Sequence, residues 1–312
     1  MLSLGIAIET TGWRAAVWDE ERAADLHTFG DVEALWDLAD ALVAKNPALP
    51  AVLPSGLGIP VTRARDLLDR DIYEMTFRMD TGRADRLASL LAEARHRLPR
   101  GLCIPGVKAL ASVPLHRKMA RVDLGGADSV SAAAWAIYAR ERGEAATSFL
   151  LLHCQEGGRT AVVVKAGRLL DGLGASVTGL GPDFQETNRA LPASGPGIWW
   201  HREAVRLAEA EARTPGSLRA ARWEAVEKEI RGFLSLYGLE HVLVMGAERE
   251  PALAALVEQL PCASLPSPMD GYESALGAAV IAAGLTGGPT APLVDRLGLR
   301  EGRDRVLDFA RS

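Results

Sequence analysis

The same local pattern occurs twice in this chain: two short apolar segments flank a tight polar turn. The first pair of segments is 2–8 and 13–18, and the second pair is 148–154 and 160–165. Glycine lies in the turn each time, and apolar segments joined by such a turn are typical of a β-hairpin. The repeat therefore predicts two hairpins, one at the start of each half of the chain.

Alternating helix and strand patterns follow each predicted hairpin. After the first hairpin, we expect a helix at 32–43 capped by Asp31, a strand at 51–53, a helix at 83–97, a strand at 101–104 and a helix at 129–142. After the second hairpin, we expect a strand at 168–172, a long helix through Trp223 and Tyr237 that ends at Gly238, a strand at 241–245, a helix from Pro251 and a small-residue helix at 272–283. This order predicts an α/β protein of two similar domains, 1–145 and 146–312. A cleft between such domains is a common place for a ligand.

Composition narrows the classes of function. The 312-residue chain has a formal net charge of −5 and no long block of Lys and Arg, so we expect no nucleic-acid partner. Its three cysteines are far apart, which indicates neither a disulfide framework nor a metal knuckle. We expect no signal peptide and no membrane span, and hence a cytoplasmic location. A small anionic substrate, a homodimer and a protein partner all remain compatible with the sequence.

Five sequence segments carry a resemblance to a known family. They are 4–11 (LGIAIETT), 54–60 (PSGLGIP), 113–128 (VPLHRKMARVDLGGAD), 158–172 (GRTAVVVKAGRLLDG) and 275–288 (ALGAAVIAAGLTGG), of which 113–128 is the most specific. On these segments the chain resembles an uncharacterised, mostly archaeal family that carries the label "predicted butyrate kinase". That family belongs to the superfamily of acetate and sugar kinases, heat-shock chaperones and actin (ASKHA).

The resemblance implies two ribonuclease-H-like (actin-like ATPase) domains that hold ATP and Mg²⁺ in the cleft between them. The implied activity is that of a kinase, a transferase that moves the γ-phosphoryl group of ATP to a small carboxylate or hydroxyl. The residues implied to approach the nucleotide are Thr10, Thr11, Gly157, Gly158, Thr160 and Gly246. Arg117, Arg121 and Asp128 would face the acceptor. Two local interpretations stand beside these roles: Asp128 as a helix N-cap and Gly246 as a plain strand-to-helix turn.

The chain departs from the superfamily pattern at both hairpins. The usual metal-positioning acids fall on Ala7 and Cys154, whereas Glu9 and Glu156 take the places of glycines near the phosphates. Either these two glutamates hold the metal from a shifted position, or they repel the triphosphate. We favour repulsion, since two glycines that allow close backbone approach are lost as well.

Three functional hypotheses remain open on this basis. The first is a kinase-like enzyme with altered phosphate motifs. The second is a non-catalytic binding or scaffold protein that keeps the cleft, in effect a pseudokinase. The third is an ATPase that activates a partner enzyme. Cys154 is a nucleophile only if a base lies beside it, and His153 should point to the opposite face of the strand, so we interpret Cys154 as a buried core residue.

Overall fold

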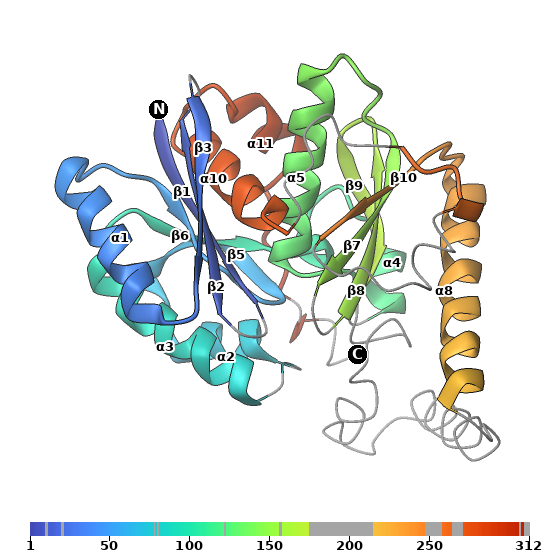
Figure 1. Ribbon diagram of the computed structural model, residues 1–312, viewed down its shortest axis with the longest axis horizontal. Helices are drawn as coiled ribbons and strands as arrows, with labels where there is room; N and C mark the ends of the chain where they lie inside the picture. Colours follow the sequence, from blue (N-terminus) through green and yellow to red (C-terminus); the bar gives the residue numbers. More distant parts are fainter. Residues whose placement is uncertain are drawn as a thin grey trace.

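A computed structural model of the 312-residue chain describes residues 1–9, 12–19, 22–77, 79, 81–121, 123–155, 158–174, 215–246, 258–263, 271–305 and 307–308. Side chains are described within these ranges except at 22–24, 155 and 215–225. Figure 1 shows two sheets with helices on both sides and between them.

The first sheet has six strands in the spatial order β3-β2-β1-β4-β6-β5. They are β1 (Leu2–Ile8), β2 (Trp13–Asp19), β3 (Arg22–Phe29), β4 (Ala51–Val52), β5 (Gly58–Arg63) and β6 (Gly101–Pro105). β1 pairs antiparallel with β2 and parallel with β4, and β4 pairs parallel with β6. This confirms the first predicted hairpin and the two short strands after it, while β3 and β5 add strands that the sequence pattern did not predict.

The second sheet has four strands in the order β10-β7-β8-β9. They are β7 (Phe149–Gln155), β8 (Gly158–Lys165), β9 (Arg168–Leu173) and β10 (Val242–Met245). β7 pairs antiparallel with β8 and parallel with β10, and an isolated parallel bridge joins Val242 to Cys262 beyond β10. Both sheets thus contain three consecutive antiparallel strands, with a later parallel strand added beside the first of the three.

Helices complete the mixed α/β fold. They are α1 (Val32–Lys45), α2 (Asp69–Thr76), α3 (Thr81–Arg97), α4 (Leu115–Ala120), α5 (Ala127–Arg142), α8 (Pro215–Tyr237), α10 (Glu273–Leu285) and α11 (Ala291–Leu297), with short 3-10 turns η1 (Ala64–Asp66) and η2 (Val107–Ala109). Asp31 caps α1 by accepting from the amide of Glu33, as predicted. Gly238 follows α8 with a φ of 60°, which confirms the predicted helix end. None of the described helices is long and apolar enough to cross a lipid bilayer.

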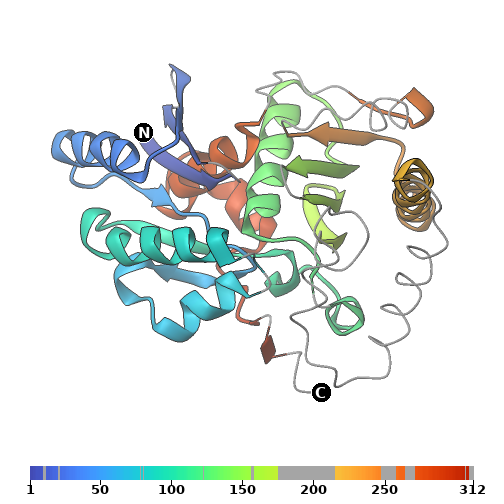
Figure 2. The same ribbon diagram turned by 60° about the horizontal axis from the view of Figure 1, so that its bottom comes forward.

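The elements stack in five layers, as the two views in Figures 1 and 2 agree. Leu4 and Ile6 of β1 pack in one core with residues of α1 and α3. Ala7, on the opposite face, belongs to a central core that also contains α5, α10 and Phe149 of β7. A third core lies between the second sheet and α8. The helices α5 and α10 therefore lie between the two sheets and contact both halves.

Small residues allow α10 to lie very close to its neighbours. A methyl group on Gly277 would collide with the carbonyl oxygen of Ser131 in α5, and one on Gly5 would collide with the carbonyl oxygen of Ala275. The hydroxyl of Ser3 also donates to the carbonyl oxygen of Ala279 across 2.8 Å. α10, which follows the second sheet in the sequence, thus packs on β1 of the first. The boundary at 145 remains a prediction.

Candidate functional site

The first turns of α5 and α10 meet between the two sheets. Ser274, the second residue of α10, donates from its hydroxyl to the carbonyl oxygen of Asp128, the second residue of α5, across 3.2 Å. Gly277 lies against Ser131 one turn further on, so the two helices run in the same direction. The positive ends of both helix dipoles therefore converge at one place.

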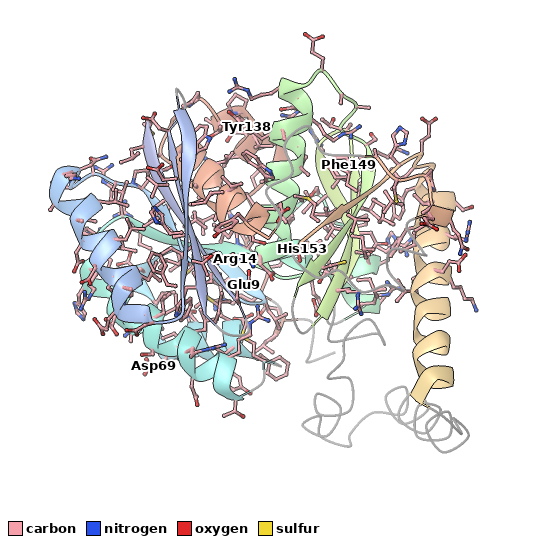
Figure 3. All side chains as sticks on the ribbon, viewed as in Figure 1. Glu9, Arg14, Asp69, Tyr138, Phe149 and His153 are labelled. Carbon is pink, nitrogen blue, oxygen red and sulfur yellow. The ribbon has the colours of Figure 1, made fainter. Side chains whose placement is uncertain are left out.

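The ends of β1 and β7 reach the same place. Figure 3 labels Glu9, Arg14 and His153, which lie between the two sheets. His153, near the end of β7, has its Nε2 atom 3.2 Å from the hydroxyl oxygen of Ser274. Arg14 of β2 lies with its guanidinium carbon 5.1 Å from the ring centre of Tyr272, the residue before α10. Contacts between side chains thus connect both hairpins to the two helix N-termini.

The hairpin registers correct one expectation. The amide of Glu9 donates to the carbonyl oxygen of Gly12 across 2.9 Å, and Gln155 pairs with Gly158, so each hairpin has two intervening turn residues. Glu9 therefore corresponds to Gln155, and Ala7 corresponds to His153 rather than to Cys154. Counted by this register, Glu9 is not equivalent to Glu156, which lies outside the described residues, so a role of Glu156 beside the phosphates stays a prediction.

Guanidinium groups surround the end of β1. Arg14 lies 3.6 Å from the carboxylate of Glu9, measured from Nη1 to Oε1. Arg83 and Arg86, from the start of α3, donate to the carbonyl oxygens of Ile8 and Glu9 across 3.2 and 3.1 Å. Three guanidinium groups thus gather at the end of β1, together with the carboxylates of Glu9, of Glu273 near Arg14 and of Asp128 near His153.

His153 is a buried, neutral histidine. Burial lowers its pKa below 6.5, and the nearby positive charge of Arg83 lowers the pKa further, while the carboxylate of Asp128 opposes both effects. Because the one hydroxyl proton of Ser274 goes to the carbonyl oxygen of Asp128, we assign the proton of the neutral imidazole to Nε2, from which it is donated to Ser274. The histidine therefore connects β7 to the first turns of α5 and α10.

Glu273 satisfies backbone groups at the start of α10. Its carboxylate accepts from the amide of Gly271 across 2.8 Å, and from the amides of Gly246 and of Glu273 itself. Burial raises the pKa of Glu273, and these hydrogen bonds and the charge of Arg14 oppose the rise. Gly246, a predicted nucleotide-binding residue, thus lies at the end of β10 with its amide bound to Glu273.

The predicted acceptor-facing residues lie in two different places. Asp128 lies beside His153 and Ser274, at the place where the first turns of α5 and α10 meet the ends of β1 and β7, which we call the junction. Arg117, by contrast, lies 3.3 Å from the carboxylate of Asp171 in β9, and Arg121 lies 3.6 Å from that of Glu229 in α8. These contacts direct the two arginines toward the second sheet and its outer helix.

The prediction that Asp128 is a helix N-cap is wrong. The N-cap of α5 is Gly126, and Asp128 accepts instead from the amide of Ser129 across 2.9 Å. The capping rule failed because Gly125 and Gly126 let the helix begin before the first capping side chain. The carboxylate of Asp128 is consequently part of the first helical turn.

The remaining predicted residues divide into described and undescribed positions. Thr160 pairs with His153 across the second hairpin, and Gly158 pairs with Gln155. Thr10, Thr11, Glu156 and Gly157 lie outside the described residues. Cys154 is buried in the core beneath α8, on the face opposite His153, which confirms its interpretation as a core residue.

The side chains of the junction fit the phosphate groups of Mg-ATP better than they fit the metal ion. Guanidinium groups and converging helix N-termini fit the phosphate groups of an anionic ligand. Within the described part of the chain, no group of three or more His, Cys, Asp or Glu side chains could hold a metal ion. Mg²⁺ is commonly held by one or two carboxylates together with phosphates, and Asp128 and Glu9 are described carboxylates of the junction that could contribute in this way.

Three solved structures show a distant likeness to the chain. They are acetate kinase from Entamoeba histolytica (9% identity, 83% of this chain, 86% of that chain, TM-score 0.48), component A of (R)-2-hydroxyglutaryl-CoA dehydratase from Acidaminococcus fermentans (14%, 89%, 96%, 0.36) and the ethanolamine utilization protein EutJ from Carboxydothermus hydrogenoformans (13%, 89%, 89%, 0.38). Because these TM-scores lie below 0.5, we base no conclusion on the three likenesses.

A sequence family gives a firmer assignment. No curated protein matches the sequence. The family described as "Protein of unknown function (DUF1464)" matches residues 31–186, which is half of the 312-residue chain. The chain belongs to the DUF1464 family.

Proposed function

We propose that the protein is a kinase-like member of the ASKHA class that binds the phosphates of ATP at the junction of α5, α10 and the two hairpins. The repeated strand order of the two sheets supports two ribonuclease-H-like domains, about 1–145 and 146–312, with the ligand between them. α5 and α10, one helix from each of these domains, meet at their N-termini, and such a place suits a ligand that both domains contact.

The observation that carries this proposal is the convergence of guanidinium groups and helix N-termini at the junction. Arg14, Arg83 and Arg86 offset the carboxylates of Glu9, Asp128 and Glu273 there, and α5 and α10 add two positive helix ends. Phosphate groups are recognised by such arrangements of guanidinium and backbone N–H groups. Thr160 and Gly158 lie on the second hairpin, where a hydroxyl and an uncrowded backbone would approach the same phosphates.

The proposed reaction is transfer of the γ-phosphoryl group to a small carboxylate or hydroxyl. The acceptor oxygen forms a bond to phosphorus while the bond to the leaving ADP oxygen breaks. Asp128 would orient the acceptor and take the proton of a hydroxyl acceptor, whereas a carboxylate acceptor has no proton to lose. Mg²⁺, when bound with the nucleotide, would neutralise the phosphate charge. Short-chain carboxylates such as butyrate are the acceptors that the family resemblance suggests.

Calorimetry with ATP, in the presence of Mg²⁺ and then of Mn²⁺, tests the proposal. We expect a binding isotherm for the wild type and about tenfold weaker binding by Arg86→Met, which removes one cation from the junction. The matched control is Arg100→Met, since Arg100 is exposed and its side chain has no contact with the junction. A wild type that binds neither metal complex of ATP would refute the proposal.

A second candidate function is nucleotide binding without phosphoryl transfer. The pairing of Arg117 with Asp171 and of Arg121 with Glu229 favours it, because both arginines were predicted to face the acceptor. Under this alternative, ATP binds but a panel of short carboxylates and alcohols gives no ADP. Under the kinase proposal, ADP forms with at least one acceptor, and Asp128→Asn abolishes its formation while ATP binding is kept.

A further inference from the structure

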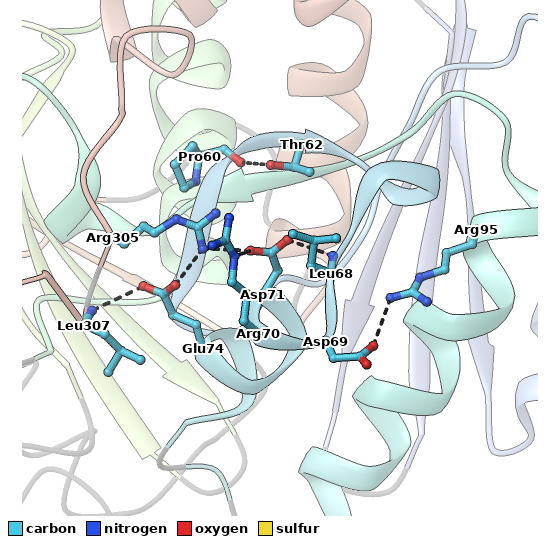
Figure 4. A network of polar contacts seen from close by, with 10 residues as sticks. All are labelled: Pro60, Thr62, Leu68, Asp69, Arg70, Asp71, Glu74, Arg95, Arg305 and Leu307. Carbon is cyan, nitrogen blue, oxygen red and sulfur yellow. Dashed lines mark hydrogen bonds and ion pairs between the residues drawn. The ribbon is translucent and has the colours of Figure 1, made fainter.

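Two adjacent residues after α11, Asp304 and Arg305, form ion pairs with two different helices. Figure 4 shows Arg305, whose Nη1 atom lies 2.8 Å from the carboxylate of Asp71 and 2.9 Å from that of Glu74, both on α2. The preceding residue, Asp304, lies 2.6 Å from Nζ of Lys118 on α4. Asp304 and Arg305 therefore connect α4 to α2.

The contacts with α2 are buried and charged. Asp71 and Glu74 are each only 3% exposed and lie three residues apart, on the same side of the helix. Two buried carboxylates at this spacing repel each other, and the guanidinium group between them offsets the repulsion. The amide of Leu307 also donates to Glu74 across 3.2 Å. Arg305 therefore stabilises α2 in its present position, in addition to Arg70, whose Nε atom lies 3.8 Å from the carboxylate of Asp71.

The end of α2 is connected to the candidate site by two backbone hydrogen bonds. The amide of Leu57 donates to the carbonyl oxygen of Met75 in α2 across 3.2 Å. The neighbouring residue, Gly56, accepts at its carbonyl oxygen from the amide of Ala127, the first residue of α5, across 2.8 Å. A shift of α2 would thus move the loop 54–57 and the first turn of α5, where Asp128 lies.

The contact with α4 connects the same segment to the second sheet. Lys118 is buried, and its neighbour Arg117 pairs with Asp171 of β9. Asp304 and Arg305 consequently join a helix that packs beside the first sheet to a helix that is tied to the second. A movement of α2 relative to α4 would therefore break at least one of these ion pairs.

We propose that Asp304, Arg305 and Leu307 form a latch that fixes the loop 54–57 and the first turn of α5, and so regulates access to the candidate site. Release of Arg305 from α2 frees this loop and the start of α5. The effect on ligand exchange rests on the proposed function, but the effect on the loop and on α5 does not.

Hydrogen exchange measured residue by residue tests the latch in the full-length protein. In Arg305→Met, we expect the amides of Leu57 and Ala127 to exchange about tenfold faster or more than in the wild type. The matched control is Arg303→Met, which makes the same change two residues earlier at an exposed side chain. The amide of Val162 in β8 should exchange at the wild-type rate in both variants, which separates local release from global unfolding.

A second pair of variants keeps the test decisive if Arg305→Met does not fold. Arg305→Lys retains the charge but loses the planar fork, and it should accelerate exchange at Leu57 and Ala127 less than Arg305→Met, relative to Arg303→Lys. Adding Glu74→Gln to Arg305→Met removes one of the two buried carboxylates that have lost their guanidinium partner and should restore part of the protection.

Two results would overturn the latch. One is exchange at Leu57 and Ala127 that stays at the Arg303→Met rate although the amides of α2 exchange faster. The other is acceleration of Val162 by the same factor as Leu57, which would make Arg305 a general stabilising residue. Failure of ATP to bind any variant would instead refute the proposed function, since the exchange rates are measured without ligand.

Discussion

His153 occupies the position in the second hairpin that Ala7 occupies in the first, and its buried imidazole makes stability depend on pH. Because its pKa lies below 6.5 in the folded chain, the unfolded chain binds the proton first as the pH falls. The free energy of unfolding should therefore rise with pH through the window just below 6.5 and level off above it. Urea unfolding from about pH 5 to about pH 7.5 measures this slope.

The variant His153→Gln should flatten that part of the profile, since glutamine keeps an N–H for Ser274 but does not titrate. The control is His96→Gln, because His96 is exposed on α3. An equal slope in the wild type and in His153→Gln would show that other groups cause the acid sensitivity.

Variants of Glu9 distinguish the two roles that the sequence left open for the hairpin acids, which are to hold the metal ion or to repel the triphosphate. Its carboxylate lies beside Arg14, so it offsets one cation of the junction. If it acts by charge alone, Glu9→Gln should strengthen ATP binding by about tenfold, and Arg14→Gln should weaken it. Calorimetry at low salt measures both. Loss of metal-dependent ATP binding in Glu9→Gln would show instead that Glu9 holds the metal.

α10 packs so closely on α5 at Gly277 that no side chain fits at this position. Gly277→Ala would place a methyl group against the carbonyl oxygen of Ser131, and we expect a loss of about 1–3 kcal/mol in the free energy of unfolding despite the better helix propensity of alanine. Gly232→Ala in α8 is the matched control, since no atom lies within 4 Å of the added methyl group. The control should gain about 0.5–1 kcal/mol.

Chemical denaturation of both variants measures the difference. Equal stability of Gly277→Ala and the wild type would mean that α10 can move away from α5. The close contact would then not determine how the two first turns meet.

Elements were predictable from the sequence where apolar spacing or a terminal residue identified them. The two hairpins, α1 and the end of α8 belong to this group. β3 was missed because the segment 22–29 (RAADLHTF) is an edge strand in which apolar and polar residues do not clearly alternate. α4 was missed because its six residues, mostly polar or charged, are too few to show a helical period. The charge balance at the end of β1 was also missed, since Arg83 and Arg86 come near Glu9 only through the packing of α3 on the sheet.

At the scale of the molecule, the repeated order of strands and helices was visible in the sequence. The packing of α10 on the first sheet, although α10 follows the second sheet in the chain, was not predicted. All thirteen residues of α10 are buried, and a helix without a polar face must lie between other layers. The composition of 273–285 thus contained a signal for a central helix. Which sheet it would cover could not be predicted, because small residues pack equally well on either face.

Separation of the two halves tests the predicted boundary. The fragment 1–145 lacks α10, so the face of β1 that bears Ala7 would be exposed. We expect this fragment to bind a hydrophobic dye and to lack cooperative unfolding, and an equimolar fragment 146–312 to restore a cooperative transition. Cooperative unfolding of 1–145 alone, measured by calorimetry, would show that the first half folds without its central helix.

The hydrogen bond between Ser3 and Ala279 has a consequence for the order of events during synthesis. The two residues are 276 positions apart, so at about 5–20 residues per second a ribosome needs roughly 15–55 s to deliver the second after the first. Throughout that interval the inner face of the earliest strand lacks α10, the helix that packs on it in the folded chain. The nascent first half must therefore wait, partly assembled, for a helix that is translated near the end.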